Sequence, residues 1–264
     1  TYYVALNLCV KDNNEGNVLD TLSYKFSTTD SFDTLTLTGN LRDAYTLMPL
    51  ESAWVMLFNE NKNDSLIFTE IPNYIAKTDK NGIFHFPNLK NKNYKIVALT
   101  DFDFIYNKGE KIAFSDSMVN AKTDSFISLF AFDPIIDIDS IITSSIPIQL
   151  DGVTTPPLDP IVKKEELPYG KLEIITNCNT ACIFQLLQNE KIITEIFFSE
   201  KPYLIDKIVA GKYQLKYIAD NNQDSIWNTG NWGRRIQPEK VVNYPSEITI
   251  RSNWDLELEW IILK

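Results

Sequence analysis

The sequence contains few of the residues that most enzyme active sites require. Its 264 residues include one histidine, His85, nine glycines and three cysteines. A Ser-His-Asp triad or a Cys-His pair would depend on His85 alone, and no Gly-x-Ser-x-Gly motif or phosphate-binding glycine loop is present. Among the 35 acidic residues, the sequence does not identify any two as the carboxylate pair of a glycosidase. The sequence therefore predicts a protein that is not an enzyme.

Positive charge is also scarce. Twenty-five Lys and Arg stand against 35 Asp and Glu, which gives a net charge of -10 and a pI of about 4.7. The best basic clusters are Lys163-Lys164 and Arg234-Arg235, each only two residues long. Because nucleic-acid binding needs clustered positive charge, no nucleic-acid partner is expected.

Long hydrophobic runs are missing as well. No stretch approaches the roughly 20 apolar residues that span a bilayer, and the start lacks the pattern of a signal peptide. The chain opens on "TYYVALNLCV", which has the character of a strand interior. We therefore expect a fragment, with a signal peptide and further protein upstream.

Short strands dominate what is present. Segments such as "DTLTLTGNL", "YKIVAL", "KLEIIT" and "EITIRS" alternate apolar and polar residues, and turn sequences such as "KTDKNG" and "LKNKN" separate them. Long amphipathic helical windows are absent. This pattern predicts an all-β protein of the sandwich or barrel type.

One stretch of the chain occurs twice. "FHFPNLKNKNYKIVALTD" aligns without a gap onto "YLIDKIVAGKYQLKYIAD", which places Phe84 with Tyr203, Tyr94 with Tyr213 and Asp101 with Asp220. Two copies of one strand order predict tandem β-sandwich domains rather than a solenoid, which needs at least three repeats.

The domain boundaries follow from this duplication. Residues 1–32 form a hairpin outside the repeat and have the character of the last strands of a preceding domain. Residues 33–132 and 169–264 are the two predicted sandwiches. Residues 133–168 contain six prolines, so we expect a Pro-rich connector whose later half is extended. Two alternatives stay open for its first half, which either adds an edge strand to the first sandwich or belongs to the connector.

The repeat motif carries a family resemblance. "KTDKNGIFHFPNLKNKNYKIVALTD" resembles the prealbumin-like, or carboxypeptidase-regulatory-like, β-sandwich, in which a turn glycine precedes a Phe-x-Phe strand. Gly82 fits the glycine that needs a positive φ. The opening "VKDNNEGNVL…YKFST" resembles the end of a bacterial immunoglobulin-like domain.

The chain as a whole is similar to Bacteroidota surface lipoproteins with Ig-like domains. Their late turn reads Asp-x-Asn-x-x-x-x-Trp-Asp-x-Gly followed by Gln-Pro-Glu, and here the second Asp is replaced by Asn228. The resemblance implies a lipid anchor at the cell surface, on the outer membrane rather than its periplasmic face. It also implies a non-enzymatic structural role in a multi-subunit envelope complex for barrel assembly or secretion, with the membrane reached only through that anchor.

Two alternatives remain open at this stage. The first is a carbohydrate-binding or adhesive module that uses exposed aromatic residues. The second is an accessory domain of an enzyme of the carboxypeptidase kind, which requires a catalytic domain upstream.

The stretch "ADNNQDSIWNTG" is the main candidate for a metal site. Asp220, Asn222 and Asp224 match positions 1, 3 and 5 of a calcium loop, but Ser225 and Asn231 do not match positions 6 and 12. A β-turn whose Asp and Asn bond their own backbone is the favoured interpretation, with no cofactor, and calcium is the alternative.

The remaining candidates are aromatic residues and thiols. Trp232, Arg234 and Arg235 lie on a predicted turn and are proposed as an interaction surface, whereas the alternation in "NWDLELEW" predicts packing for Trp254 and Trp260. Cys178 and Cys182 are predicted to form a disulfide, with two free thiols as the alternative. Cys9 is expected to be buried.

Overall fold

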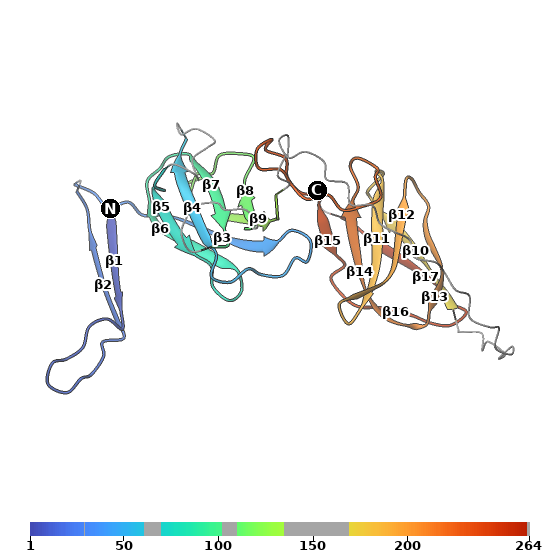
Figure 1. The fold of residues 1–264 in the computed structure, drawn as a ribbon, viewed down its shortest axis with the longest axis horizontal. Helices are drawn as coiled ribbons and strands as arrows, with labels where there is room; N and C mark the ends of the chain where they lie inside the picture. Colours follow the sequence, from blue (N-terminus) through green and yellow to red (C-terminus); the bar gives the residue numbers. More distant parts are fainter. Residues whose placement is uncertain (29, 61–69, 102–109, 135–168, 263–264) are drawn as a thin grey trace, which may run out of the picture. The chain divides into compact units, whose positions relative to one another are not determined.

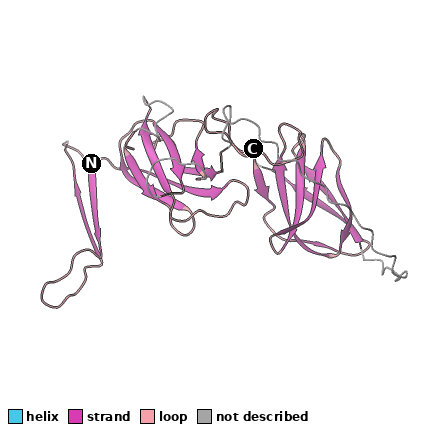
Figure 2. Ribbon diagram, in the orientation of Figure 1, coloured by secondary structure: helices cyan, strands magenta, loops and turns pink. Residues whose placement is uncertain are grey.

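The computed structural model describes residues 1–28, 30–60, 70–101, 110–134 and 169–262. Every regular element in these ranges is a β-strand (Figure 2). No helix there has the length and apolar character needed to cross a membrane. The predicted connector, apart from Asp133 and Pro134, lies outside the described residues.

The chain starts with a two-stranded antiparallel hairpin, β1 (Tyr2–Asn7) and β2 (Thr21–Phe26). Its cross-strand pairs place Tyr2 opposite Phe26, with their rings stacked 5.1 Å apart, and Val4 opposite Tyr24. These four side chains share one face and are exposed. Cys9 follows β1 and is also exposed, so the prediction that it is buried is wrong.

The first sandwich consists of two sheets (Figure 1). One has the order β6-β3-β9 and the other the order β5-β4-β7-β8. The strands of the first sheet are β3 (Leu35–Asp43), β6 (Ile83–Leu89) and β9 (Phe126–Ala131). Those of the second are β4 (Trp54–Asn59), β5 (Tyr74–Lys77), β7 (Tyr94–Leu99) and β8 (Ile112–Phe114).

The second sandwich has the same arrangement, with orders β13-β10-β17 and β12-β11-β14-β15. Its first sheet contains β10 (Tyr169–Thr176), β13 (Tyr203–Val209) and β17 (Asp255–Trp260). Its second contains β11 (Cys182–Gln188), β12 (Lys191–Phe198), β14 (Gly211–Ala219) and β15 (Val241–Asn243), and β16 (Ile248–Ile250) also pairs with β14.

The two strand orders correspond one to one. In each sandwich the central strand of the three-stranded sheet, β3 or β10, pairs antiparallel with one neighbour and parallel with the other. The prediction of an all-β fold with tandem β-sandwiches is therefore confirmed.

Each core lies between its two sheets and follows the predicted alternation. Along β10 every second residue is buried, and Leu172 and Ile174 contribute to the core. In the first sandwich Leu37 and Phe84 from one sheet meet Val55 from the other. Burying one face of each sheet against the other is the main stabilising contribution in such a fold.

The duplication extends to backbone irregularities. The pairing of β3 with β6 shifts register between Leu35 and Leu37, and that of β10 with β13 shifts between Gly170 and Leu172. Opposite these shifts, Asn88 and the aligned Lys207 have φ values of 58° and 57°. Because non-glycine residues rarely adopt positive φ, a shared strained residue at the same bulge indicates a shared backbone design.

Gly82 also behaves as predicted. It has a φ of 74° in the turn before β6, and a Cβ there would lie 2.4 Å from the carbonyl oxygen of Leu41. Both the backbone angle and the available space therefore require glycine.

A buried tyrosine closes each sandwich in the same way. The hydroxyl of Tyr94 donates to the carbonyl oxygen of Lys90 at 3.1 Å, and that of Tyr213 donates to the carbonyl of Val209 at 2.8 Å. In each case the bond spans the point where the chain leaves the three-stranded sheet and enters the other. This is the geometry of a tyrosine corner.

By its internal contacts the chain divides into two units. Unit 1 comprises Thr1–Pro134 and Thr229–Pro238, and unit 2 comprises Ile135–Asn228 and Glu239–Lys264. The segment Thr229–Pro238 was expected in the second sandwich, because it falls between β14 and β15 in the sequence. In the structure it packs as part of unit 1.

We predict that Tyr94→Phe and Tyr213→Phe each destabilise the unit that contains the change. Each removes one hydrogen bond to a backbone carbonyl, worth about 1 kcal/mol. Amide hydrogen exchange of the full chain should show faster exchange in β6 and β7 for Tyr94→Phe, and in β13 and β14 for Tyr213→Phe. The control Tyr169→Phe removes a hydroxyl from a side chain that is 42% exposed and should leave exchange unchanged. Unchanged protection in both corner variants would contradict the prediction.

Candidate functional site

The loop after β14 is held together by two buried carboxylates. Asp220 is 1% exposed, and its oxygens accept the backbone N–H groups of Asp224 and Ser225 at 3.2 and 2.9 Å. Glu239 is 7% exposed and accepts the N–H groups of Asn221 and Asn228 at 2.7 and 2.9 Å. Inside the loop, both carboxylates therefore accept backbone N–H groups that a strand partner would otherwise accept.

The other members of the predicted calcium set belong to the same network. One carboxylate oxygen of Asp224 accepts the amide N–H groups of Asn222 and Asn228 at 2.8 and 3.0 Å. Trp227 donates its indole N–H to the carbonyl of Glu239 at 2.9 Å. The structure thus brings Asp220, Asn222 and Asp224 into one loop, where their oxygens accept hydrogen bonds within the loop.

Burial governs the protonation equilibrium of Glu239 in this loop. Burial raises the pKa of Glu239 above its ordinary value, against the backbone N–H groups that lower it, and the neighbouring Asp220 and Asp224 add to the rise. Among the described residues, no three histidine, cysteine or carboxylate side chains are placed to share a metal ion. Calcium binding remains the alternative that only an experiment tests.

The predicted interaction residues Trp232, Arg234 and Arg235 occupy different environments. Trp232 is 8% exposed, with its ring edge-on to Phe114 at a centroid distance of 5.2 Å. The guanidinium of Arg235 lies 3.7 Å from the centre of the Trp232 ring. Arg234 is exposed. Trp232 and Arg235 thus contact other residues of unit 1.

Further contacts hold this segment within unit 1. The amide N–H groups of Gln237 bond the carbonyl of Phe114 at 3.0 Å and Asp116 at 2.9 Å, and Thr229 donates to the carbonyl of Asp133 at 2.7 Å. A Cβ at Gly230 would lie 2.6 Å from the Phe132 ring, so only glycine fits there.

Trp254 and Trp260 differ in exposure. Trp260 is 6% exposed, as expected, but Trp254 is 59% exposed because it precedes β17, so the prediction that it packs is wrong.

Cys178 and Cys182 are free thiols in the structure, which is the second of the two alternatives. Burial raises the pKa of the Cys182 thiol to about 12, which keeps it protonated.

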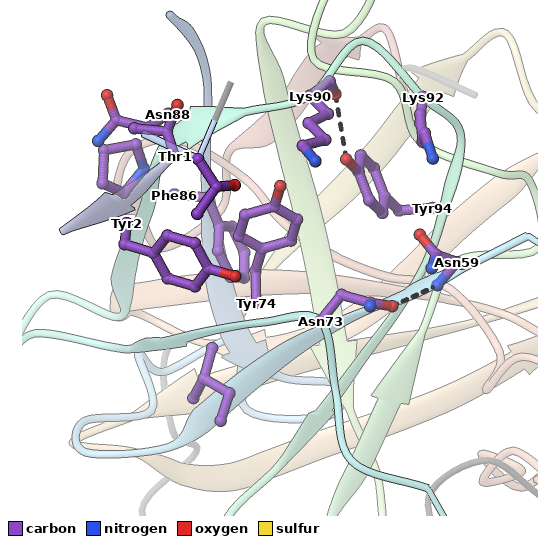
Figure 3. Close-up of a pocket in the computed structure, with 13 residues that line it drawn as sticks. Thr1, Tyr2, Asn59, Asn73, Tyr74, Phe86, Asn88, Lys90, Lys92 and Tyr94 are labelled. Atoms are coloured by element: carbon purple, nitrogen blue, oxygen red, sulfur yellow. Dashed lines mark hydrogen bonds between the residues drawn. The ribbon is translucent and has the colours of Figure 1, made fainter. Parts of the chain in front are cut away.

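A pocket of about 440 Å³ in unit 1 is the main cavity candidate for ligand binding (Figure 3). Its walls come from the edge strands β5 and β6, from the start of β7 and from the first residues of the hairpin. Figure 3 draws the rings of Tyr2, Tyr74 and Phe86 on one side and the side chains of Lys90 and Lys92 on the other. The size lies within the range of small-molecule sites.

The polar groups of this pocket are amides, hydroxyls and the ammonium groups of two lysines. The side-chain oxygen of Asn73 accepts the N–H of Asn59 at 2.9 Å, which leaves its amide N–H groups for other acceptors. Burial raises the pKa of Tyr94 above its ordinary value, with a further contribution from Tyr74, so the phenol stays neutral. Among its described lining residues no carboxylate, imidazole or thiol occurs. Such a lining can bind a ligand through hydrogen bonds, charge and aromatic contact.

Sequence reasoning did not identify this pocket. Its residues are spread from the hairpin to β7, and single tyrosines and asparagines at these positions have no distinctive spacing. The nearest available signal was the repeat itself, since Phe86 and Tyr94 are members of the aligned motif.

No protein-family model matches this sequence, and no curated protein matches it. Among solved structures, GBS52, the minor pilin of Streptococcus agalactiae, is 12% identical, with 86% of this chain and 95% of that chain covered and a TM-score of 0.27. The Streptococcal ancillary pilin is 9% identical, with 97% and 74% covered and a TM-score of 0.25.

The Bacillus anthracis TIE protein is 13% identical, with 93% of this chain covered and a TM-score of 0.24. This chain spans about a third of the length of that protein, at 35%. Scores this low carry no argument about function, which therefore rests on the chain's own residues.

We predict that Trp232→Ala destabilises unit 1 by about 3 to 5 kcal/mol, because it leaves a cavity beside Phe114. Hydrogen exchange should become faster in β8, where Phe114 lies, and chemical unfolding should begin at lower denaturant. The matched control is Trp254→Ala, since that ring is 59% exposed. An equal loss of stability in the two variants would show that Trp232 has no special packing role.

We predict that calcium leaves the melting temperature of the full chain unchanged. The loop oxygens of Asp220 and Asp224 already accept hydrogen bonds, so binding would require breaking them. Melting is measured in a chelator and in millimolar calcium, for the natural chain and for Asp224→Asn. A calcium-dependent rise that Asp224→Asn abolishes would establish the calcium alternative.

Proposed function

We propose that this chain is a non-enzymatic cell-surface lipoprotein that acts as a structural and protein-interaction subunit of an outer-membrane complex. The barrel-assembly and secretion machineries are the kinds of complex that the family resemblance suggests. A lipid anchor N-terminal to these residues would hold it at the outer membrane. The pocket of unit 1, which is lined by amide, hydroxyl, ammonium and aromatic groups, supports a role in binding.

The observation that carries this proposal is a pair of exposed phenylalanines on β9. Phe126 is 53% exposed and Phe130 is 39% exposed. Because alternate residues of a strand share a face, Phe126, Ser128 and Phe130 all lie on the outward face of β9. β9 is an edge strand of its sheet. Exposed aromatic side chains on a sheet edge are typical of a protein-binding surface.

The second sandwich provides an internal control for this interpretation. Its edge strand β17 pairs with β10 in the same parallel register in which β9 pairs with β3. There Glu257 and Glu259, both exposed, stand in the registers of Phe126 and Ser128. The register of Phe130 corresponds to Ile261, which is 74% exposed. Because the second sandwich folds with glutamate at the register of Phe126, folding does not require phenylalanine there. A partner with an apolar surface that covers Phe126 together with Phe130 is the explanation we propose.

We predict that Phe126→Glu combined with Phe130→Glu abolishes association with the partner complex while the fold is retained. The natural and variant proteins are expressed at full length in the native host, crosslinked in intact cells and purified from outer membranes. Mass spectrometry should identify subunits of one envelope machine with the natural chain and not with the variant.

The matched control is Glu257→Gln combined with Glu259→Gln, which alters the equivalent strand and should leave association intact. Circular dichroism and hydrogen exchange establish that each variant is folded. If the natural protein purifies alone, or if the double glutamate variant keeps the same subunits, the proposal is wrong.

A further inference from the structure

We propose that the pocket between β5, β6, β7 and the hairpin binds an anionic sugar unit of an acidic polysaccharide, such as a uronic acid or a sulfated sugar. This site is separate from the phenylalanines of β9 and does not depend on the docking function proposed above. The inference rests on the charge, the hydrogen-bonding groups and the aromatic surface of the pocket.

The charge of the lining is opposite to that of the chain. The protein has a net charge of -10, yet the described lining includes Lys90 and Lys92 and no carboxylate of its own. The adjacent carboxylate of Asp33, which bonds Thr1 of the lining, also attracts Lys90. Both lysines are exposed, so their ammonium groups are hydrated and can pair with an anion at the pocket edge without a large cost of burial. A ligand with a carboxylate or sulfate group matches this edge.

The amides match hydroxyl groups. Asn73 offers its amide N–H groups because its oxygen is held by the N–H of Asn59. Asn88 is fixed by the bulge at φ 58° and adds a second amide, which both donates and accepts. Together these groups suit a ligand with several oxygen acceptors in a small volume, as a sugar ring has.

The rings provide the apolar contact that a sugar needs. Tyr74 is half-buried and Tyr2 is 55% exposed, so these two rings can contact a ligand. Tyr94, edge-on to Tyr74 at a centroid distance of 5.6 Å, and Phe86 are each 1% exposed and belong to the core. Tyr94 is fixed in turn by its bond to Lys90. The wall is therefore positioned by the core before any ligand arrives, which lowers the entropic cost of binding. An extended acidic peptide would match the lysines but would use the amides and rings less completely.

The test is isothermal titration of the full chain with three oligosaccharides: a trigalacturonate, a chondroitin sulfate tetrasaccharide and the neutral maltotriose. At least one acidic oligosaccharide should bind, more weakly as salt rises, and maltotriose should not. A Glu-rich peptide of the same net charge is titrated alongside.

Three variants locate the site. Lys90→Gln combined with Lys92→Gln should weaken binding by up to about 25-fold, since each of the two exposed ion pairs contributes up to about fivefold in affinity. Asn73→Asp keeps the oxygen that accepts the N–H of Asn59 but replaces the amide donor with a negative charge, and should abolish binding. Lys80→Gln combined with Lys122→Gln removes two exposed lysines elsewhere in unit 1 and should change nothing.

Each contrary result overturns the proposal. Failure of both acidic oligosaccharides to bind removes the site, and equal binding of maltotriose removes the requirement for an anion. Tighter binding of the Glu-rich peptide would assign the pocket to a protein ligand. Equal weakening by the control lysine pair would show that only the overall charge matters. None of these results bears on the copurification experiment, so the two proposals can fail separately.

Discussion

The crossover between the two sheets of each sandwich is fixed by one recurring interaction, the hydrogen bond from a buried tyrosine hydroxyl to the carbonyl four residues earlier. Tyr94 and Tyr213 each make it where the chain passes from one sheet to the other. A crossover leaves backbone carbonyls without strand partners next to the core, and a buried unpaired carbonyl is costly. The phenol satisfies one such group and places its ring in the core at the same time.

The two copies show which features such a sandwich requires and which it leaves free. The corner tyrosine, the register shift and the positive φ at Asn88 and Lys207 are common to both. The outward positions of the edge strand are not, since one copy has Phe126 and the other Glu257 at equivalent registers. Features held in common are explained by folding, so the differences between the copies are where function is best sought.

The sequence predicted the features that depend on local pattern. Alternation identified the core faces, the repeat identified the tandem sandwiches, and the turn before β6 identified the positive φ of Gly82. It did not predict long-range packing: Trp232 is buried against Phe114, which is distant in sequence. Trp254 continues the alternation of β17 but comes immediately before the strand begins, where no opposite sheet covers its side chain. The pocket was missed for the same reason, because its residues converge only in the fold.

The contrast between the Asp220 loop and the pocket shows why residue type alone does not define a binding site. A carboxylate spaced for calcium is equally spaced for backbone N–H groups, and Asp220 meets those instead. Conversely, the pocket for which we propose an anionic ligand presents two lysines in a chain of net charge -10. At physiological ionic strength the screening length is about 8 Å, so most carboxylates of the chain contribute little at the lysines, and Asp33 is the acidic group that acts on Lys90. At both sites the local arrangement of groups therefore matters more than the net charge of the chain. It leaves the acidic loop bonded to backbone N–H groups and gives the pocket two lysines.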